Sequence, residues 1–166
     1  LKPMKGIAPQ LSQILPGFNI GGVMGALASP NFNTTFEELR CVSLDRDAGV
    51  LHAAVQVKRS SGYSGNLCTA GSKEYVAFYL DFGSGWEYAG TSFVPVHDIQ
   101  DIPAGGLWYD VAKGVNLENH RKPWCTVDKV KVRAILSWST PPTPGDPDYV
   151  AHWGDWEECT VEVQPL

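Results

Sequence analysis

Apolar and polar side chains alternate along most of the chain after residue 35, and this pattern predicts β-strands. The clearest example spans residues 50–58, where Leu51, Ala53 and Val55 fall on one face and His52 and Gln56 on the other. Successive side chains of a strand point to opposite faces, so the pattern indicates a strand with one buried face. Strands are expected at residues 36–44, 50–58, 74–82, 86–96, 107–117, 130–138 and 156–163.

Turn-forming segments separate these predicted strands and favour an antiparallel arrangement. The Gly-Ser-Gly sequence 83–85 predicts a tight hairpin, and the segments 59–72 and 139–148 predict longer loops. Seven or eight strands with frequent turns, and no helix after residue 35, are typical of an all-β fold. We expect an antiparallel, immunoglobulin-like β-sandwich, although a barrel or a jelly roll has the same sequence pattern.

The first 35 residues differ from the rest because they contain none of the 18 acidic side chains. We therefore divide the chain into an apolar N-terminal extension, residues 1–32, and a sandwich domain, residues 33–166. The apolar and glycine residues of the extension suit a strand added to the open sheet edge of a neighbouring subunit. The alternative is that the extension covers its own sandwich. The residues expected to make the assembly contact are Ile14, Phe18, Ile20, Val23, Met24 and Leu27.

Composition and charge narrow the classes of partner. The chain carries 13 basic and 18 acidic residues, a net charge of −5, and its basic clusters are short. Phosphate binding requires clustered Lys and Arg, so we expect no nucleic-acid partner. A run of about 18 apolar residues is absent, which argues against a membrane span. We expect no cofactor, because the potential ligands have no recognisable metal-binding spacing.

Four cysteines, at positions 41, 68, 125 and 159, indicate an oxidising compartment. Their spacing is not that of a zinc site, and an even number favours two disulfides. Of the three possible connectivities we favour Cys41–Cys159 and Cys68–Cys125, because the first and last strands of a sandwich often lie close together. Asn33 begins an Asn-Thr-Thr glycosylation sequon. We therefore expect an extracellular or cell-surface glycoprotein.

Residues that could support catalysis are sparse. Ser64 lies in a Gly- and Ser-rich loop that lacks the strand-to-helix context of a nucleophile elbow. His97 and Asp98 are adjacent, and neighbours on a strand point to opposite faces, so a structural role at the strand end is favoured. The segment 81–87 offers too few oxygen ligands for calcium. We therefore expect no catalytic and no metal-binding residues.

Two pairs of adjacent glutamates, Glu37–Glu38 and Glu157–Glu158, also fail to indicate a catalytic carboxylate pair. Neighbouring side chains on a strand cannot face one site together. We interpret both pairs as charged strand edges that discourage unwanted pairing with other sheets.

The six tryptophans allow a role in sugar binding. Exposed aromatic rings on loops are candidates for binding, and Trp153 and Trp156 follow the proline-rich loop. Trp138 follows Val132, Ala134 and Leu136 in steps of two, so we expect its ring to be buried in the core. The face of that strand which carries Ile135 is expected to be more hydrated.

Five blocks of the sequence carry a resemblance, at residues 36–42, 61–68, 71–78, 96–99 and 132–138. Together they resemble a domain that recurs in uncharacterised secreted bacterial proteins. The resemblance covers about residues 33–164 and implies a secreted β-sandwich, but it brings no known activity. Such domains often have an Asp-rich turn where this chain has residues 81–85, so a calcium loop implied by the resemblance is lost here.

These observations together favour a structural role. We expect a non-enzymatic, secreted or surface subunit that assembles with copies of itself, as a homo-oligomer or polymer, through the N-terminal extension. One alternative is a glycan-binding β-sandwich module, and another is a secreted hydrolase.

Overall fold

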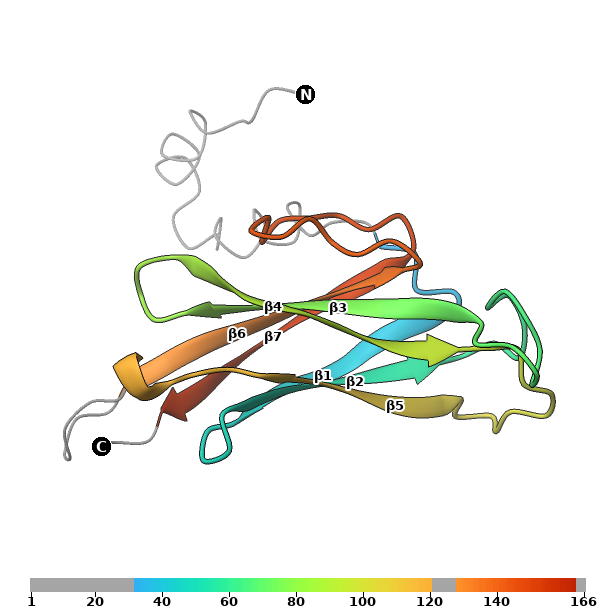
Figure 1. Cartoon of the computed structure of the whole chain (residues 1–166), viewed down its shortest axis with the longest axis horizontal. Coiled ribbons are helices and arrows are strands. Elements are labelled where there is room, and N and C mark those ends of the chain that lie inside the picture. Colours follow the sequence, from blue (N-terminus) through green and yellow to red (C-terminus); the bar gives the residue numbers. More distant parts are fainter. Residues whose placement is uncertain (1–31, 121–127, 164–166) are drawn as a thin grey trace, which may run out of the picture. The chain divides into compact units, whose positions relative to one another are not determined.

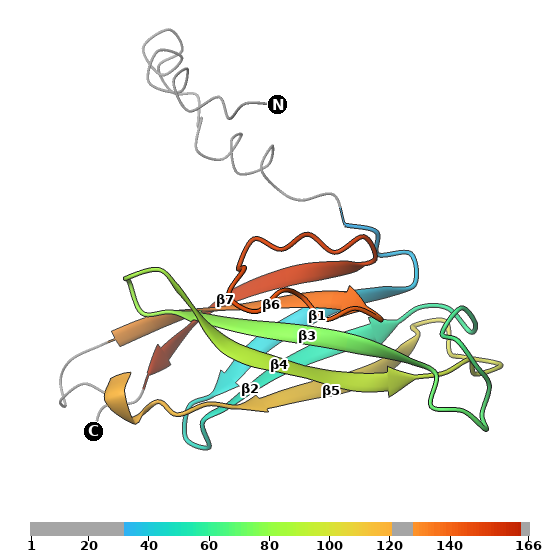
Figure 2. The same ribbon diagram turned by 45° about the horizontal axis from the view of Figure 1, so that its top comes forward.

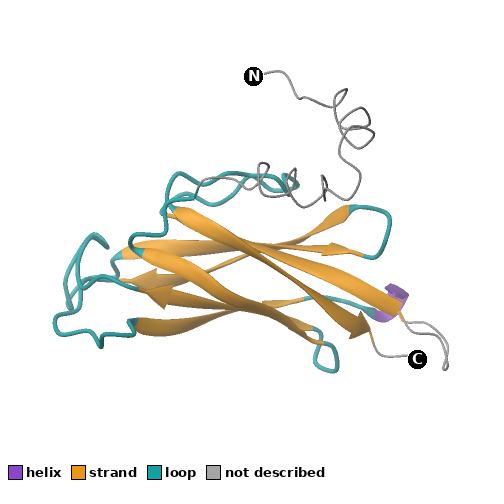
Figure 3. Ribbon diagram, turned by 180° about the vertical axis from the view of Figure 1, so that it is seen from behind, coloured by secondary structure: helices purple, strands orange, loops and turns teal. Residues whose placement is uncertain are grey.

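The computed structural model describes residues 32–120 and 128–163, and this part of the chain is all-β (Figure 1). Each strand expected from the alternation corresponds to an observed strand, with bounds that differ by a few residues. The described strands are β1 (Glu37–Asp45), β2 (Val50–Val57), β3 (Ser72–Asp81), β4 (Trp86–Val96), β5 (Leu107–Gly114), β6 (Asp128–Trp138) and β7 (Gly154–Val163). A short 3-10 helix, η1 (Glu118–His120), follows β5 (Figure 3). No helix among the described residues has the length and apolar character needed to cross a membrane.

The strands form two antiparallel sheets that face each other (Figure 2). The first sheet has the order β1-β2-β5 and the second has the order β4-β3-β6-β7. Leu51, Ala53 and Val55 of β2 and Val76 and Phe78 of β3 belong to one buried cluster between the sheets. Full burial of a side chain such as that of Phe78 contributes about 1.5–3 kcal/mol. The described domain is thus held together by the faces that the alternation predicted to be apolar.

The outer face of the second sheet departs from the expectation. Ile135 is buried there together with Ala77 and Tyr79, because the loop of residues 139–153 covers them. The hydroxyl of Tyr79 donates a hydrogen bond of 2.9 Å to the carbonyl oxygen of Asp146 in this loop. The prediction of a hydrated Ile135 face is therefore wrong, since a proline-rich loop shields that face from solvent.

Arg133 of β6 fastens this loop to the sheet. Its guanidinium carbon lies 4.4 Å from the ring centroids of both Trp86 and Trp156. The same group donates hydrogen bonds to the carbonyl oxygen of Pro147, at 2.6 Å, and to the Glu158 carboxylate, at 2.6 Å. The Trp156 ring thus makes a cation–π contact with an arginine of its own chain, and its sugar-binding role stays a prediction.

The cysteines do not form the bridge expected between the first and last strands. Cys41 and Cys159 are free thiols, so the predicted Cys41–Cys159 disulfide is not formed. The strands themselves are neighbours, since the Leu39 N–H donates a hydrogen bond to the Asp155 carboxylate at 3.2 Å. Burial, and then the nearby Cys41 thiol, raise the pKa of Cys159. The prediction of a bond is wrong because neighbouring strands do not by themselves supply the specific geometry that a disulfide requires.

Several predictions fall on residues that the structure does not describe. Cys125 is one of them, so the Cys68–Cys125 pairing stays a prediction. Residues 1–31 lie outside the described part as well, and with them all six predicted assembly residues: Ile14, Phe18, Ile20, Val23, Met24 and Leu27.

Candidate functional site

Two glutamates point into the sandwich at one end, where apolar residues would be expected. Glu37, at the start of β1, shares the inward face with Leu39, and Glu74 of β3 shares it with Val76 and Phe78. Glu37 is 1% exposed and Glu74 is 0% exposed. Fully buried glutamates are rare unless they are paired, so this pair is the most unusual feature of the described core.

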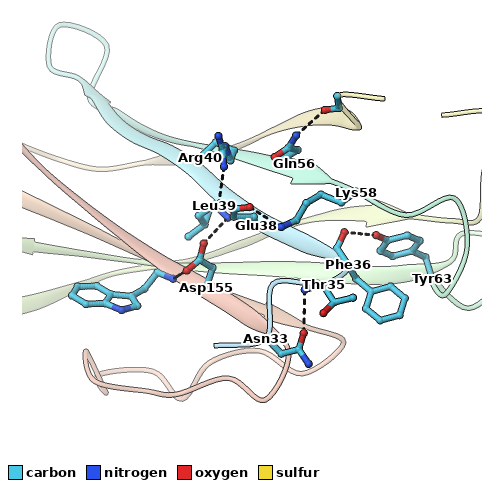
Figure 4. A network of polar contacts seen from close by, with 12 residues as sticks. Asn33, Thr35, Phe36, Glu38, Leu39, Arg40, Gln56, Lys58, Tyr63 and Asp155 are labelled. Carbon is cyan, nitrogen blue, oxygen red and sulfur yellow. Dashed lines mark hydrogen bonds and ion pairs between the residues drawn. The ribbon is translucent and has the colours of Figure 1, made fainter. Parts of the chain in front are cut away.

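Most of the carboxylate oxygens of this pair have no hydrogen-bonding partner. The Ser72 hydroxyl donates to Oε1 of Glu74 at 3.0 Å. Oε2 of Glu74 and both oxygens of Glu37 are buried without a partner among the described residues. The neighbouring cation, Lys58, donates instead to Oε2 of Glu38 at 2.7 Å (Figure 4). Leaving a buried polar atom unsatisfied costs about 1–3 kcal/mol, so the arrangement is expensive for the fold.

Burial changes the acidity of both groups. Burial raises the pKa of Glu37 to about 7, against the opposing effect of the Lys58 charge. The pKa of Glu74 is raised to about 8, first by burial and then by the charge of Glu37, although the Ser72 hydrogen bond acts in the opposite direction. Two buried carboxylates cannot easily be ionised together. Near neutral pH the pair therefore retains a proton.

Glu37 adjoins a cavity of about 290 Å³, which we call the end pocket, whereas Glu74 acts on Glu37 and does not line the cavity. The aromatic walls are arranged edge to face: the Phe36 ring lies 5.3 Å from Trp153 and 6.1 Å from Tyr63, at interplanar angles of 83° and 88°. Trp138 completes the walls, and Glu37, whose two carboxylate oxygens are buried, is also among the lining residues. The lining residues are Phe36, Glu37, Gly62, Tyr63, Trp138 and Trp153.

The loop between β2 and β3 builds one wall of the end pocket. The Asp98 carboxylate accepts hydrogen bonds from the backbone N–H groups of Gly62 and Tyr63, both at 2.8 Å. The Tyr63 hydroxyl donates to the carbonyl oxygen of Phe36 at 2.7 Å (Figure 4). Asp98 thus holds a pocket loop in place, whereas Nδ1 of His97 is buried without a hydrogen-bonding partner among the described residues.

Gly62 allows the Phe36 ring to approach this loop. Its φ angle is +115°, and a Cβ atom there would lie 2.5 Å from Cε1 of Phe36. We expect Gly62→Ala to displace the ring and to lower the free energy of unfolding by at least about 2 kcal/mol, from backbone strain and steric overlap together. Urea denaturation measures this change.

The chain offers a matched control for that substitution. Gly85 has the same φ angle of +115°, but nothing lies within 4 Å of a Cβ atom built on it. Gly85→Ala therefore carries the backbone strain without the overlap, and we expect it to cost about 1 kcal/mol. Equal costs for the two substitutions would show that the Phe36 contact is unimportant.

The structure brings one of the two predicted sugar-binding residues to the end pocket. Trp153 lines it, whereas Trp156 packs on Arg133 on the outer face of the sheet. Trp138 lies on the inward face, as its spacing predicted, but it is half-buried at the pocket and not enclosed in the core. Asn33 is half-buried, and its side-chain oxygen accepts a hydrogen bond from the Thr35 N–H at 3.0 Å. Its glycosylation stays a prediction.

Reasoning from the sequence misses the two glutamates that define the site. The interpretation of Glu37–Glu38 as a charged strand edge is wrong for Glu37, which is buried. Only Glu38 lies outward, where it forms ion pairs with Arg40 and Lys58, both at 2.7 Å. The sequence does contain a signal, because Glu74 stands two residues before Val76 in the apolar register of its strand.

The fold and the site define a two-sheet β-protein with an aromatic pocket that ends on buried acids. Comparison with known proteins adds no identity to this description: no family model, no curated protein and no solved structure matches the chain.

Proposed function

We propose that this domain is a non-catalytic binding module that holds a small ligand in the end pocket. The observation that carries the proposal is the meeting of Phe36, Trp138 and Trp153 with the unpartnered carboxylate of Glu37 in one cavity. Ligand sites are typically apolar and aromatic hollows with a few polar groups that fix orientation. The end pocket has this composition.

The size of the pocket limits what it can hold. A volume of about 290 Å³ lies at the lower end of the usual range for ligand sites. It suits a single sugar ring, an alkylammonium group or one protruding side chain, each of which can place an apolar surface against the aromatic walls. A sugar ring held against Trp153 would agree with part of the glycan-binding alternative. Trp156 does not line this pocket.

A binding role is favoured over hydrolysis by the groups at the pocket. The residues that line it include no serine, cysteine or histidine to act as a nucleophile or its base, and Glu37 is the one carboxylate among them, whereas glycoside hydrolysis commonly uses two. Ser64, the weak nucleophile candidate, is exposed in the same loop and is not among them.

The proposal is tested by small-molecule binding to the full chain, followed through the tryptophan indole signals in NMR spectra. We expect millimolar glucose or an alkylammonium salt to shift the Trp138 and Trp153 signals, and Trp153→Leu to weaken that binding at least about tenfold. Trp108→Leu is the matched control, because Trp108 is 56% exposed and does not line the pocket. An absence of pocket shifts with both ligand classes, or an equal loss in both variants, would contradict the proposal.

We also propose that the fold is immunoglobulin-like. The strand orders β1-β2-β5 and β4-β3-β6-β7 support this, since β2 and β5 are neighbours in one sheet while β3 and β6 are neighbours in the other. In constant-type immunoglobulin domains the fourth strand joins the first sheet, whereas here β4 pairs with β3.

Secretion and self-assembly of the chain remain proposals from the sequence. The Asn33 sequon supports secretion, as does the resemblance to a domain of secreted bacterial proteins. Self-assembly through residues 1–32 also stays a prediction, because nearly all of that segment lies outside the described residues.

A further inference from the structure

The buried glutamates beside the end pocket have too few neighbouring cations to neutralise them. The groups that face Glu37 are Lys58, which directly follows β2, Glu74 from β3 and Tyr63 from the adjoining loop. Lys58 is the cation among them, and its ammonium group is committed to Glu38 at 2.7 Å. Asp155 of β7, whose carboxylate accepts a hydrogen bond from the Leu39 N–H, adds a further carboxylate near this edge. The surroundings of the pocket therefore favour an incoming cation.

The aromatic walls have the same preference. The face of an aromatic ring carries partial negative charge and attracts a cation that lies within about 6 Å of its centroid. Such rings repel anionic ligands, and so do two carboxylates. A neutral sugar could donate hydroxyl hydrogens to the unpartnered oxygens, but it would leave the shortage of charge unchanged.

We propose that the end pocket selects a ligand with an ammonium group, primary or quaternary, which lies against Phe36, Trp138 and Trp153 and is neutralised by Glu37. Glu74, which does not line the cavity, adds a second negative charge next to Glu37. This inference rests on the proposed binding function and specifies its ligand class. The ammonium group satisfies the charge of the unpartnered carboxylates, and the rings enclose the alkyl part of the ligand. Aromatic cages of this kind suit quaternary ammonium groups in particular.

Binding is linked to protons, because a cation favours the ionised carboxylates. Burial raises the pKa of Glu37 to about 7 and, together with the charge of Glu37, that of Glu74 to about 8. A ligand of fixed charge therefore binds more tightly as the pH rises through this range, and it releases protons when it binds. A neutral ligand of the same shape lacks this dependence.

Choline and 3,3-dimethylbutan-1-ol provide the test, because they share a shape and differ by one positive charge. We expect calorimetry on the full chain at pH 8.5 to give an affinity for choline at least about tenfold higher than for the alcohol. The affinity for choline should fall at pH 5.5. Titrations in two buffers of different ionisation enthalpy should show proton release near pH 7.5.

Variants separate the role of the buried acids from a general effect of charge. Glu74→Gln and Glu37→Gln should each weaken choline binding while leaving the alcohol unaffected. Glu118→Gln is the matched control, since Glu118 is an exposed glutamate of η1, which follows the end of β5 that is far from Glu37, and this variant should bind choline as the unmodified chain does.

The measurements distinguish a failure of the ammonium inference from a failure of the proposed binding function. If the alcohol binds as tightly as choline and shifts the Trp153 signal, the ammonium inference is overturned while the binding function stands. The same holds if glucose binds and choline does not. If choline, the alcohol and glucose all leave the pocket signals unchanged, the proposed function itself fails.

Discussion

Replacing both Glu37 and Glu74 with glutamine is expected to make the folded chain more stable at pH 8 than the unmodified chain. Burial raises the pKa of Glu37 from 4.5 to about 7 and that of Glu74 from 4.5 to about 8. Between pH 4.5 and 8 the folded state thus binds more protons than the unfolded state, so stability falls as the pH rises. The glutamine amides cannot ionise, and this loss is absent from the double variant.

The size of the effect follows from the shifts. One pKa unit corresponds to about 1.4 kcal/mol, and we expect the unmodified chain to lose at least about 3 kcal/mol between pH 5 and pH 8. The double variant should lose distinctly less. Burial also raises the pKa of Asp155 to about 6. The double variant should therefore still lose some stability as the pH rises, but less than the unmodified chain.

Thermal or urea unfolding at half-unit pH steps measures this slope. Glu118→Gln is the control, because Glu118 is exposed on η1, which follows the end of β5 that is far from Glu37. This variant should lose stability with rising pH as steeply as the unmodified chain. A double variant that lost stability as steeply as the unmodified chain would show that the two glutamates are not the groups that titrate.

The second large effect is expected from Arg133→Ala. The Arg133 side chain is 13% exposed and lies between the rings of Trp86 and Trp156. Its removal leaves Glu158 without its ion-pair partner and frees the covering loop, so we expect a loss of about 3 kcal/mol. Trp153 ends the same loop, and ligand binding in the end pocket should weaken as well.

Two further variants show which property of Arg133 matters. Arg133→Lys retains the charge but loses the planar group that stacks on both rings, and we expect an intermediate loss. Lys131→Ala, at an exposed position two residues earlier on β6, should change the free energy of unfolding by less than about 0.5 kcal/mol. A cost below about 1 kcal/mol for Arg133→Ala would rule out its role in fastening the loop.

The strands could be predicted because the information that defines them is local. In β2 the alternation of Leu51, Ala53 and Val55 with polar residues does not depend on the remaining fold. In β1 the alternation is interrupted, since a bulge between Leu39 and Cys41 places Arg40 out of step. Steps of two counted back from Val42 through this bulge place Glu38 on the apolar face, although Glu37 is the buried residue.

The site and the covered face could not be predicted, because both depend on segments without periodicity. Nothing in residues 139–153 indicates that this loop lies over Ile135 or that it carries Trp153 to the end pocket. The approach of Glu37 to Glu74 joins strands from different sheets, and only the packing of the two sheets brings them together. The geometry between Cys41 of β1 and Cys159 of β7 is likewise a property of the packed sheets.

The buried acids also make the stability of the folded chain depend on whether a cationic ligand is bound. A fold that is weakened at alkaline pH by two unneutralised carboxylates regains that stability when a cation occupies the site. A compound library can therefore be screened by melting temperature at two pH values, and the natural ligand need not be identified first. Compounds that raise the melting temperature more at pH 8 than at pH 5.5 are those that supply the missing charge.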